Sequence, residues 1–179
     1  YSDFIIGAGY NDEAGESAGQ AYLFFGDATG WAMDTSLANA DASFLGEAAF
    51  DYAGGSVGGG GDLDGDGYDD LLIGAAGNDE ADTFAGQLYV VFGQPSGWAM
   101  DTALSGSDAS MHGEVGLDGL GQPEIVGDLN GDGLADFVVG VGGNDEAGSG
   151  AGQTYVVFGR VAGWSMDLSI STADGSFLG

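Results

Sequence analysis

Short apolar runs that follow an Asp and end at a Gly recur along the chain. They occupy residues 4–6, 71–73 and 137–139. A continuous apolar run of this length, bounded by Gly, is typical of a β-strand buried on both faces. Gly interrupts every stretch that could otherwise carry a helical period. The pattern therefore predicts an all-β fold.

Further runs predict the rest of each sheet. Aromatic and β-branched residues, which strands favour, make up residues 22–25, 88–92 and 154–158. We expect a third strand around 43–45 and its copies, and a fourth around 52–57 and 115–120. These assignments give about four antiparallel strands in each unit.

The whole pattern is an internal repeat. The apolar run returns after 67 residues and again after 66, and the sequence Gly-Trp-x-Met-Asp recurs at 30–34, 97–101 and 163–167. A four-stranded unit at fixed period is typical of a β-propeller blade. A solenoid of short hairpins is the alternative. We divide the single region 1–179 into repeats 1–46, 47–113 and 114–179, of which the first lacks its first strand and most of one loop.

Three blades are too few for a closed ring, since propellers use four to eight. We therefore expect either a larger propeller in a longer chain or assembly with a second copy, and we favour the longer chain.

Two nine-residue turns of the pattern Asp-x-[Asp/Asn]-x-Asp-Gly-x-x-Asp precede the second and third apolar runs. Alternation directs the side chains at positions 1, 3 and 5 into one loop, Gly at position 6 permits the sharp turn, and position 9 closes the cage. Such oxygen donors suit Ca²⁺ better than Mg²⁺, so we predict at least two calcium sites. The expected ligands are Asp62, Asp64, Asp66, the Tyr68 carbonyl and Asp70, then Asp128, Asn130, Asp132, the Leu134 carbonyl and Asp136.

Two other interpretations of these turns were weighed. The helix-loop-helix calcium motif requires Glu at position 12, where this chain has Ile73 and Val139 inside apolar runs, and is excluded. A merely polar turn is disfavoured because the register occurs twice. In the first repeat only Asp3 corresponds to the motif, so a third site would be incomplete.

The run Gly-Asp-Leu-Asn-Gly-Asp-Gly-Leu-Ala-Asp-Phe-Val-Val-Gly at 127–140, followed by Ala-Gly-Gln-Thr-Tyr-Val-Val-Phe-Gly at 151–159, resembles the FG-GAP repeat of integrin alpha-subunit propellers and of bacterial surface and secreted proteins. The resemblance implies a propeller, usually seven-bladed, with Ca²⁺ between the first and second strands of a blade. It implies the same aspartate and asparagine ligands.

Charge and composition exclude several functions. The chain has 29 Asp and Glu against one basic residue, a net charge of −28, so nucleic-acid binding and attraction to anionic lipid are not expected. No apolar run is long enough to span a membrane. With no Lys, no Cys and one His, no phosphate loop and no catalytic triad can be identified. We predict no catalytic residues.

The predicted function is an extracellular or cell-surface calcium-binding module for adhesion, assembly or recognition of a protein or glycan ligand. The alternatives are the non-catalytic propeller of a secreted hydrolase or lyase, and a lectin that stacks sugars on Trp31, Trp98 and Trp164. Because a Trp repeated in each unit more often packs between blades, we favour packing. The acidic loops that follow the apolar runs, at 11–16, 78–82 and 144–146, are either a second cation site or solvated loops, and we favour the latter.

Overall fold

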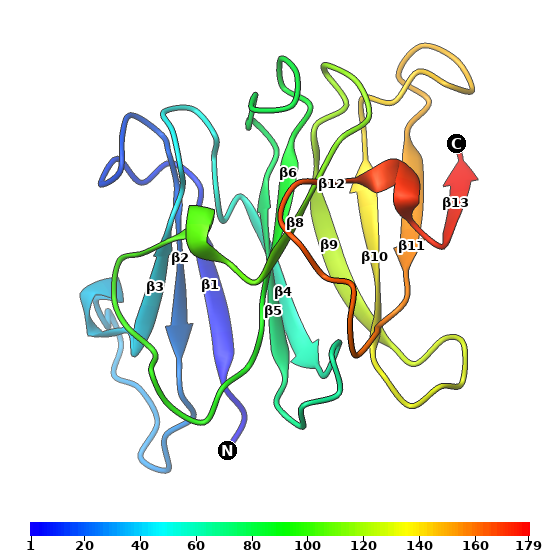
Figure 1. Cartoon of the computed structure of the whole chain (residues 1–179). Coiled ribbons are helices and arrows are strands. Elements are labelled where there is room, and N and C mark those ends of the chain that lie inside the picture. Colours follow the sequence, from blue (N-terminus) through cyan, green and yellow to red (C-terminus); the bar gives the residue numbers. More distant parts are fainter.

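A computed structural model describes residues 1–179 as three β-sheets that lie side by side in sequence order (Figure 1). The first contains β1 (Phe4–Ala8), β2 (Gln20–Phe24), β3 (Ala42–Leu45) and β7 (Thr102–Ala103). The second contains β4 (Ser56–Gly61), β5 (Asp70–Ala75), β6 (Gln87–Val91), β8 (Ala109–His112) and β12 (Leu168–Ser169). The third contains β9 (Leu120–Gly127), β10 (Asp136–Val141), β11 (Gln153–Val157) and β13 (Gly175–Leu178).

The helical content is three short 3-10 turns, η1 (Leu37–Asn39), η2 (Leu104–Gly106) and η3 (Ile170–Thr172). The prediction of an all-β fold is therefore confirmed. The structure contains no helix with the length and apolar character needed to cross a bilayer.

Each complete repeat forms four consecutive antiparallel strands, as the repeat pattern predicts. β4, β5, β6 and β8 pair in that order in the second sheet, and β9, β10, β11 and β13 in the third. The first sheet has only β1, β2 and β3 from its own repeat.

The strand that we expected at 52–57 and 115–120 begins later, as β4 and β9. Tyr52 and Leu117 adopt left-handed backbone angles, with φ of 57° and 70°, and such residues turn the chain out of an extended path. The Tyr52 N–H bonds to the Ser17 carbonyl instead of to a neighbouring strand. The strand itself runs through the glycines 58–61, whose low β-propensity hides it from a reading based on residue type.

Two short strands cross from one repeat to the sheet of the preceding repeat. β7 of the second repeat pairs in parallel with β3, and β12 of the third repeat pairs in parallel with β8. Both follow a Gly-Trp-x-Met-Asp sequence. We call residues 30–39, 97–106 and 163–172, which run from this sequence through the following 3-10 turn, the crossing segments.

The core consists of two apolar clusters, one on each face of the second sheet. Along β5, Leu71 and Ile73 belong to the cluster shared with the first sheet, and Leu72 belongs to the cluster shared with the third. All residues of β5 are buried, which confirms the double burial expected of that apolar run. In β1 the side chains of Phe4 and Ile6 are partly exposed because one face of the first sheet has no neighbour.

Glycine allows the sheets to approach closely. A Cβ atom added to Gly7 would collide with the carbonyl of Gly54, and one added to Gly74 would collide with the carbonyl of Gly121. The Gly that ends each of the first two apolar runs is thus the point where the next sheet makes contact.

Candidate metal centre

The two nine-residue turns join the first and second strands of their sheets. The turn at 62–70 connects β4 to β5, and the turn at 128–136 connects β9 to β10. In the first turn, Gly65 and Gly67 have φ of +83° and +93°, angles that residues with a Cβ adopt with strain. The predicted position between the first two strands is therefore correct.

Asp62 organises the first turn from inside. Its Oδ1 accepts hydrogen bonds from the backbone N–H groups of Gly65 at 2.6 Å and Asp66 at 3.2 Å, and its Oδ2 accepts one from Gly67 at 2.9 Å. Bonds of this kind hold the loop in a fixed curve around the carboxylate, so the turn is shaped without any bound ion.

Three carboxylates of this turn lie close together. Oxygen atoms of Asp62, Asp64 and Asp70 are all within 4.8 Å of one another. Asp66 is not in this group, and its Oδ1 accepts the N–H of Tyr68 at 2.8 Å. The Tyr68 carbonyl accepts no hydrogen bond within the chain and stays available. This cluster of hard oxygen donors fits a Ca²⁺ ion.

Asp70 connects the turn to the rest of the sheet. It is fully buried, its Oδ2 accepts the N–H of Leu63 at 2.6 Å, and its Oδ1 accepts the N–H of Gly93 at 2.7 Å. Gly93 belongs to the repeated Phe-Gly sequence. We had assigned Asp70 only as a ligand, so its bond to the Phe-Gly turn is a role that sequence reasoning missed.

The electrostatics of the first turn favour a cation. Burial raises the pKa of the Asp70 carboxyl from 3.8 to about 6, against the opposing effect of the Gly93 and Leu63 N–H groups, and the charges of Asp64 and Asp62 add to the rise. Partial burial also raises the pKa of Asp64, and the charges of Asp66 and Asp62 contribute. A bound divalent cation would relieve this repulsion.

The second turn repeats the same framework with one carboxylate fewer. Asp128 accepts the N–H groups of Gly131 at 2.6 Å and Gly133 at 2.9 Å, and these bonds, the Gly133 bond first, lower the pKa of Asp128. The Asn130 amide donates to Asp132 Oδ2 at 2.9 Å. The Leu134 carbonyl accepts no hydrogen bond within the chain.

Position 9 behaves alike in all three repeats. Asp136 accepts the N–H groups of Leu129 at 2.6 Å and Gly159 at 2.9 Å. In the first repeat, Asp3 accepts the N–H of Gly26 at 2.7 Å. Asp3 therefore keeps the link to the Phe-Gly turn, although the other motif positions have no counterpart in its repeat.

The acidic loops lie at the other ends of the strands. In the second repeat the metal turn precedes β5 and the loop at 78–82 follows it. Asn78 is buried, donates to the Tyr89 hydroxyl at 3.4 Å and accepts the N–H of Glu80 at 3.0 Å. The Asn thus anchors the loop, while the side chains of Asp79 and Glu80 are exposed.

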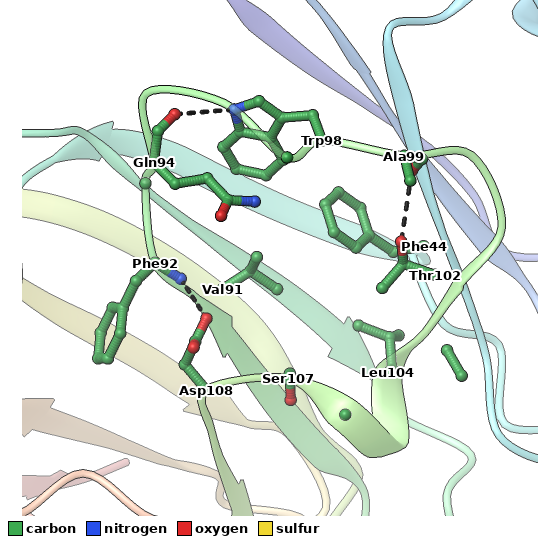
Figure 2. Close-up of a pocket in the computed structure, with 14 residues that line it drawn as sticks. Phe44, Val91, Phe92, Gln94, Trp98, Ala99, Thr102, Leu104, Ser107 and Asp108 are labelled. Carbon is green, nitrogen blue, oxygen red and sulfur yellow. Dashed lines mark hydrogen bonds between the residues drawn. The ribbon is translucent and has the colours of Figure 1, made fainter.

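The repeated Trp residues contact neighbouring sheets. The ring of Trp98 makes edge contacts with Phe25 and Phe44 of the first repeat, at centroid distances of 6.3 and 6.2 Å. Its indole N–H donates to the Gln94 carbonyl at 3.0 Å, and Figure 2 shows the pocket that Trp98 and Phe44 line with Leu104 under the crossing segment. These contacts agree with a packing role for Trp98.

Comparison with known families identifies the repeat. The FG-GAP repeat matches residues 53–91 and 125–157, and each matched segment contains one nine-residue turn with the strands on both sides of it. The comparison with curated proteins finds no match to the chain.

Proposed function

The chain carries FG-GAP repeats, and from this premise we propose that it is a calcium-stabilised, integrin-like β-propeller module. Its role is binding rather than catalysis: it presents loops on a rigid disc for adhesion, assembly or recognition. An extracellular or cell-surface location follows from the family, whose repeats are typical of surface and secreted proteins.

One observation carries the calcium proposal. The carboxylates of Asp62, Asp64 and Asp70 converge within 4.8 Å in a turn that backbone N–H groups already hold in shape. Three negative charges at this separation repel one another strongly, and a single divalent ion between them converts repulsion into attraction. Ca²⁺ accepts six to eight oxygen ligands in adaptable geometry, which the carboxylates, the Tyr68 carbonyl and water can supply.

The ion would act on the sheet through Asp70. A cation that binds Asp70 fixes the end of β5, and the hydrogen bond from Gly93 extends this constraint to the end of β6. Calcium therefore stabilises the three-strand unit β4–β5–β6 as well as the turn. Extracellular modules use weak sites, with Kd of order 10⁻⁴–10⁻³ M, because calcium there is millimolar.

Thermal unfolding with and without calcium tests the proposal. We expect millimolar Ca²⁺ to raise the melting temperature and a chelator to lower it, because a ion that binds only the folded chain stabilises it by mass action. Mg²⁺ at the same concentration is the control and should have a smaller effect. A melting temperature that does not change between Ca²⁺ and chelator would refute the calcium role.

A further inference from the structure

The crossing segment of the second repeat is attached to the first sheet by a buried polar cluster. Asp101 Oδ1 accepts hydrogen bonds from the Gln20 amide at 3.0 Å and the Ser43 hydroxyl at 3.0 Å. The backbone N–H of Asp101 donates to Ser43 Oγ at 2.7 Å, and the N–H of Ser43 donates to the Ala99 carbonyl at 3.1 Å. We call this arrangement of Asp, Ser and Gln the latch.

The same latch attaches the third repeat to the second sheet. Asp167 Oδ1 accepts hydrogen bonds from Gln87 and Ser110, both at 3.1 Å, and the N–H of Asp167 donates to Ser110 Oγ at 2.8 Å. Two latches with the same partners define how one repeat covers the outer strand of the preceding sheet.

The third sheet has the receiving half of a latch with nothing bound to it. Gln153 and Ser176 occupy the positions of Gln20 and Ser43, but no hydrogen bond joins them to an Asp, and Gln153 Oε1 is buried without a partner. The outer strand β13 pairs only with β11.

The apolar residue of this outer strand is also uncovered. Phe177 is 68% exposed, whereas its equivalents Phe44 and Met111 are 4% and 1% exposed beneath the crossing segments of the next repeats. The other two repeats therefore define what kind of group covers this position.

The first repeat has the inserting half of a latch with no sheet beneath it. Its crossing segment has the sequence Gly-Trp-Ala-Met-Asp at 30–34, identical to that at 97–101. Asp34 makes no side-chain hydrogen bond in the chain, and Met33 is 90% exposed against 39% for Met100. Leu104 and Ile170 of the other crossing segments are buried, but Leu37 of η1 is not.

The free segment already has the conformation of the attached ones. The φ angle of Asp34 is 59°, and those of Asp101 and Asp167 are 58° and 57°. A left-handed angle is unusual for a residue other than Gly, so its retention without a partner indicates that the segment is preorganised. Preorganisation lowers the entropy cost of docking.

We propose that the uncovered edge of the third sheet, β13 with Gln153, is a docking site for residues 30–39 of a second copy of this chain. Asp34 of one copy completes the latch with Ser176 and Gln153 of the other, and the docked segment covers Phe177. The contact is head-to-tail, so two copies that dock reciprocally fill both free halves and close a dimer of six sheets. This inference goes beyond the proposed function, because the docking residues lie outside the metal turns.

The test is the mass of the 179-residue chain in millimolar calcium, measured by sedimentation equilibrium across a wide range of protein concentration. We expect a concentration-dependent dimer. Two single variants block opposite halves of the contact. Asp34→Lys reverses the charge of the inserting residue, and Phe177→Asp places a charge on the apolar face that must be covered. Both residues are solvent-exposed, so neither change disturbs the folded monomer.

Each variant alone should be monomeric, since it lacks one half of the contact. A mixture of the two retains one intact pairing, the Asp34 of the Phe177→Asp chain with the β13 edge of the Asp34→Lys chain. We therefore expect the mixture to form a dimer where the separate variants do not.

Three results would overturn the inference. They are a wild-type chain that stays monomeric at the highest concentration, a dimer that both variants leave unchanged, and a mixture of variants that does not associate. A synthetic peptide of residues 26–40 that binds a monomeric wild-type chain also rejects a second copy as the occupant, and assigns the edge to a further repeat. None of these results depends on the calcium effect on melting, so the two proposals fail separately.

Discussion

Asp70 Oδ1 accepts a 2.7 Å hydrogen bond from the backbone N–H of Gly93, which lies 23 residues further along the chain. The equivalent pairs Asp136–Gly159 and Asp3–Gly26 have the same sequence separation. The bond joins the last residue of the metal turn to the Phe-Gly turn that ends the next strand. It explains why Asp and Phe-Gly recur together, and it predicts that Asp70 stabilises the fold even without metal.

Replacing Asp70 with Asn should lower the free energy of unfolding by about 1–3 kcal/mol in the presence of a chelator, because buried N–H groups lose a charged acceptor. Chemical denaturation measures the change. Asp69→Asn is the matched control, since Asp69 is exposed and removes the same charge from the same turn. Equal unfolding midpoints for the two variants would contradict the structural role of Asp70.

Asp64→Ala should weaken calcium binding at the first turn by roughly tenfold or more, since the site loses one of three clustered carboxylates. Stability without metal should change little, because Asp64 accepts only the N–H of Asp66. Calorimetric titration gives both the affinity and the number of sites. Asp79→Ala removes an exposed carboxylate outside the turns and should leave the affinity unaltered.

Metal-free stability should fall as the pH rises from about 4 to about 6. The pKa of Asp70 is raised by burial from 3.8 to about 6, so in this interval the folded chain binds more protons than the unfolded chain. The free energy of unfolding then decreases with increasing pH, by linkage. Calcium, which binds the ionised carboxylate, should weaken or reverse this trend. The measurement is a series of melting temperatures against pH with and without calcium, and a metal-free melting temperature that rises through this interval would be the opposite result.

Asp101→Asn should destabilise the chain by about 1–2 kcal/mol, because the amide weakens two charge-assisted hydrogen bonds in a buried latch. Asn tolerates the left-handed backbone angle of this position, so strain does not confuse the comparison. Asp34→Asn is the matched control, with the same substitution in an identical sequence that has no sheet beneath it. At concentrations where the chain is monomeric, its melting temperature should equal that of the wild type.

The sequence was most informative where repetition and chemistry coincide. The apolar runs and the Asp-x-[Asp/Asn]-x-Asp-Gly pattern predict β5, β10 and the turns before them, because double burial and oxygen donors restrict the choice of residues. The first strand of each repeat was placed too early, since residues 58–61 are glycines that pair through their backbone alone.

The latch and the Asp70–Gly93 bond were not predicted. Both join residues far apart along the chain, and Ser, Gln and Gly have many ordinary roles. The identical spacing of Gln20, Ser43 and Asp101 to Gln87, Ser110 and Asp167 was the available signal, but repetition alone does not say which repeated residues touch.

The crossing segments give the molecule the order of overlapping roof tiles, in which each repeat lies partly on the one before it. Removing one tile uncovers apolar surface on its neighbour, as Phe44 and Met111 would become wet if residues 97–106 or 163–172 lifted away. Nearest-neighbour coupling of this kind makes repeats melt together rather than singly. Loss of order should therefore spread backward along the chain, from a detached segment to the repeat that it shelters.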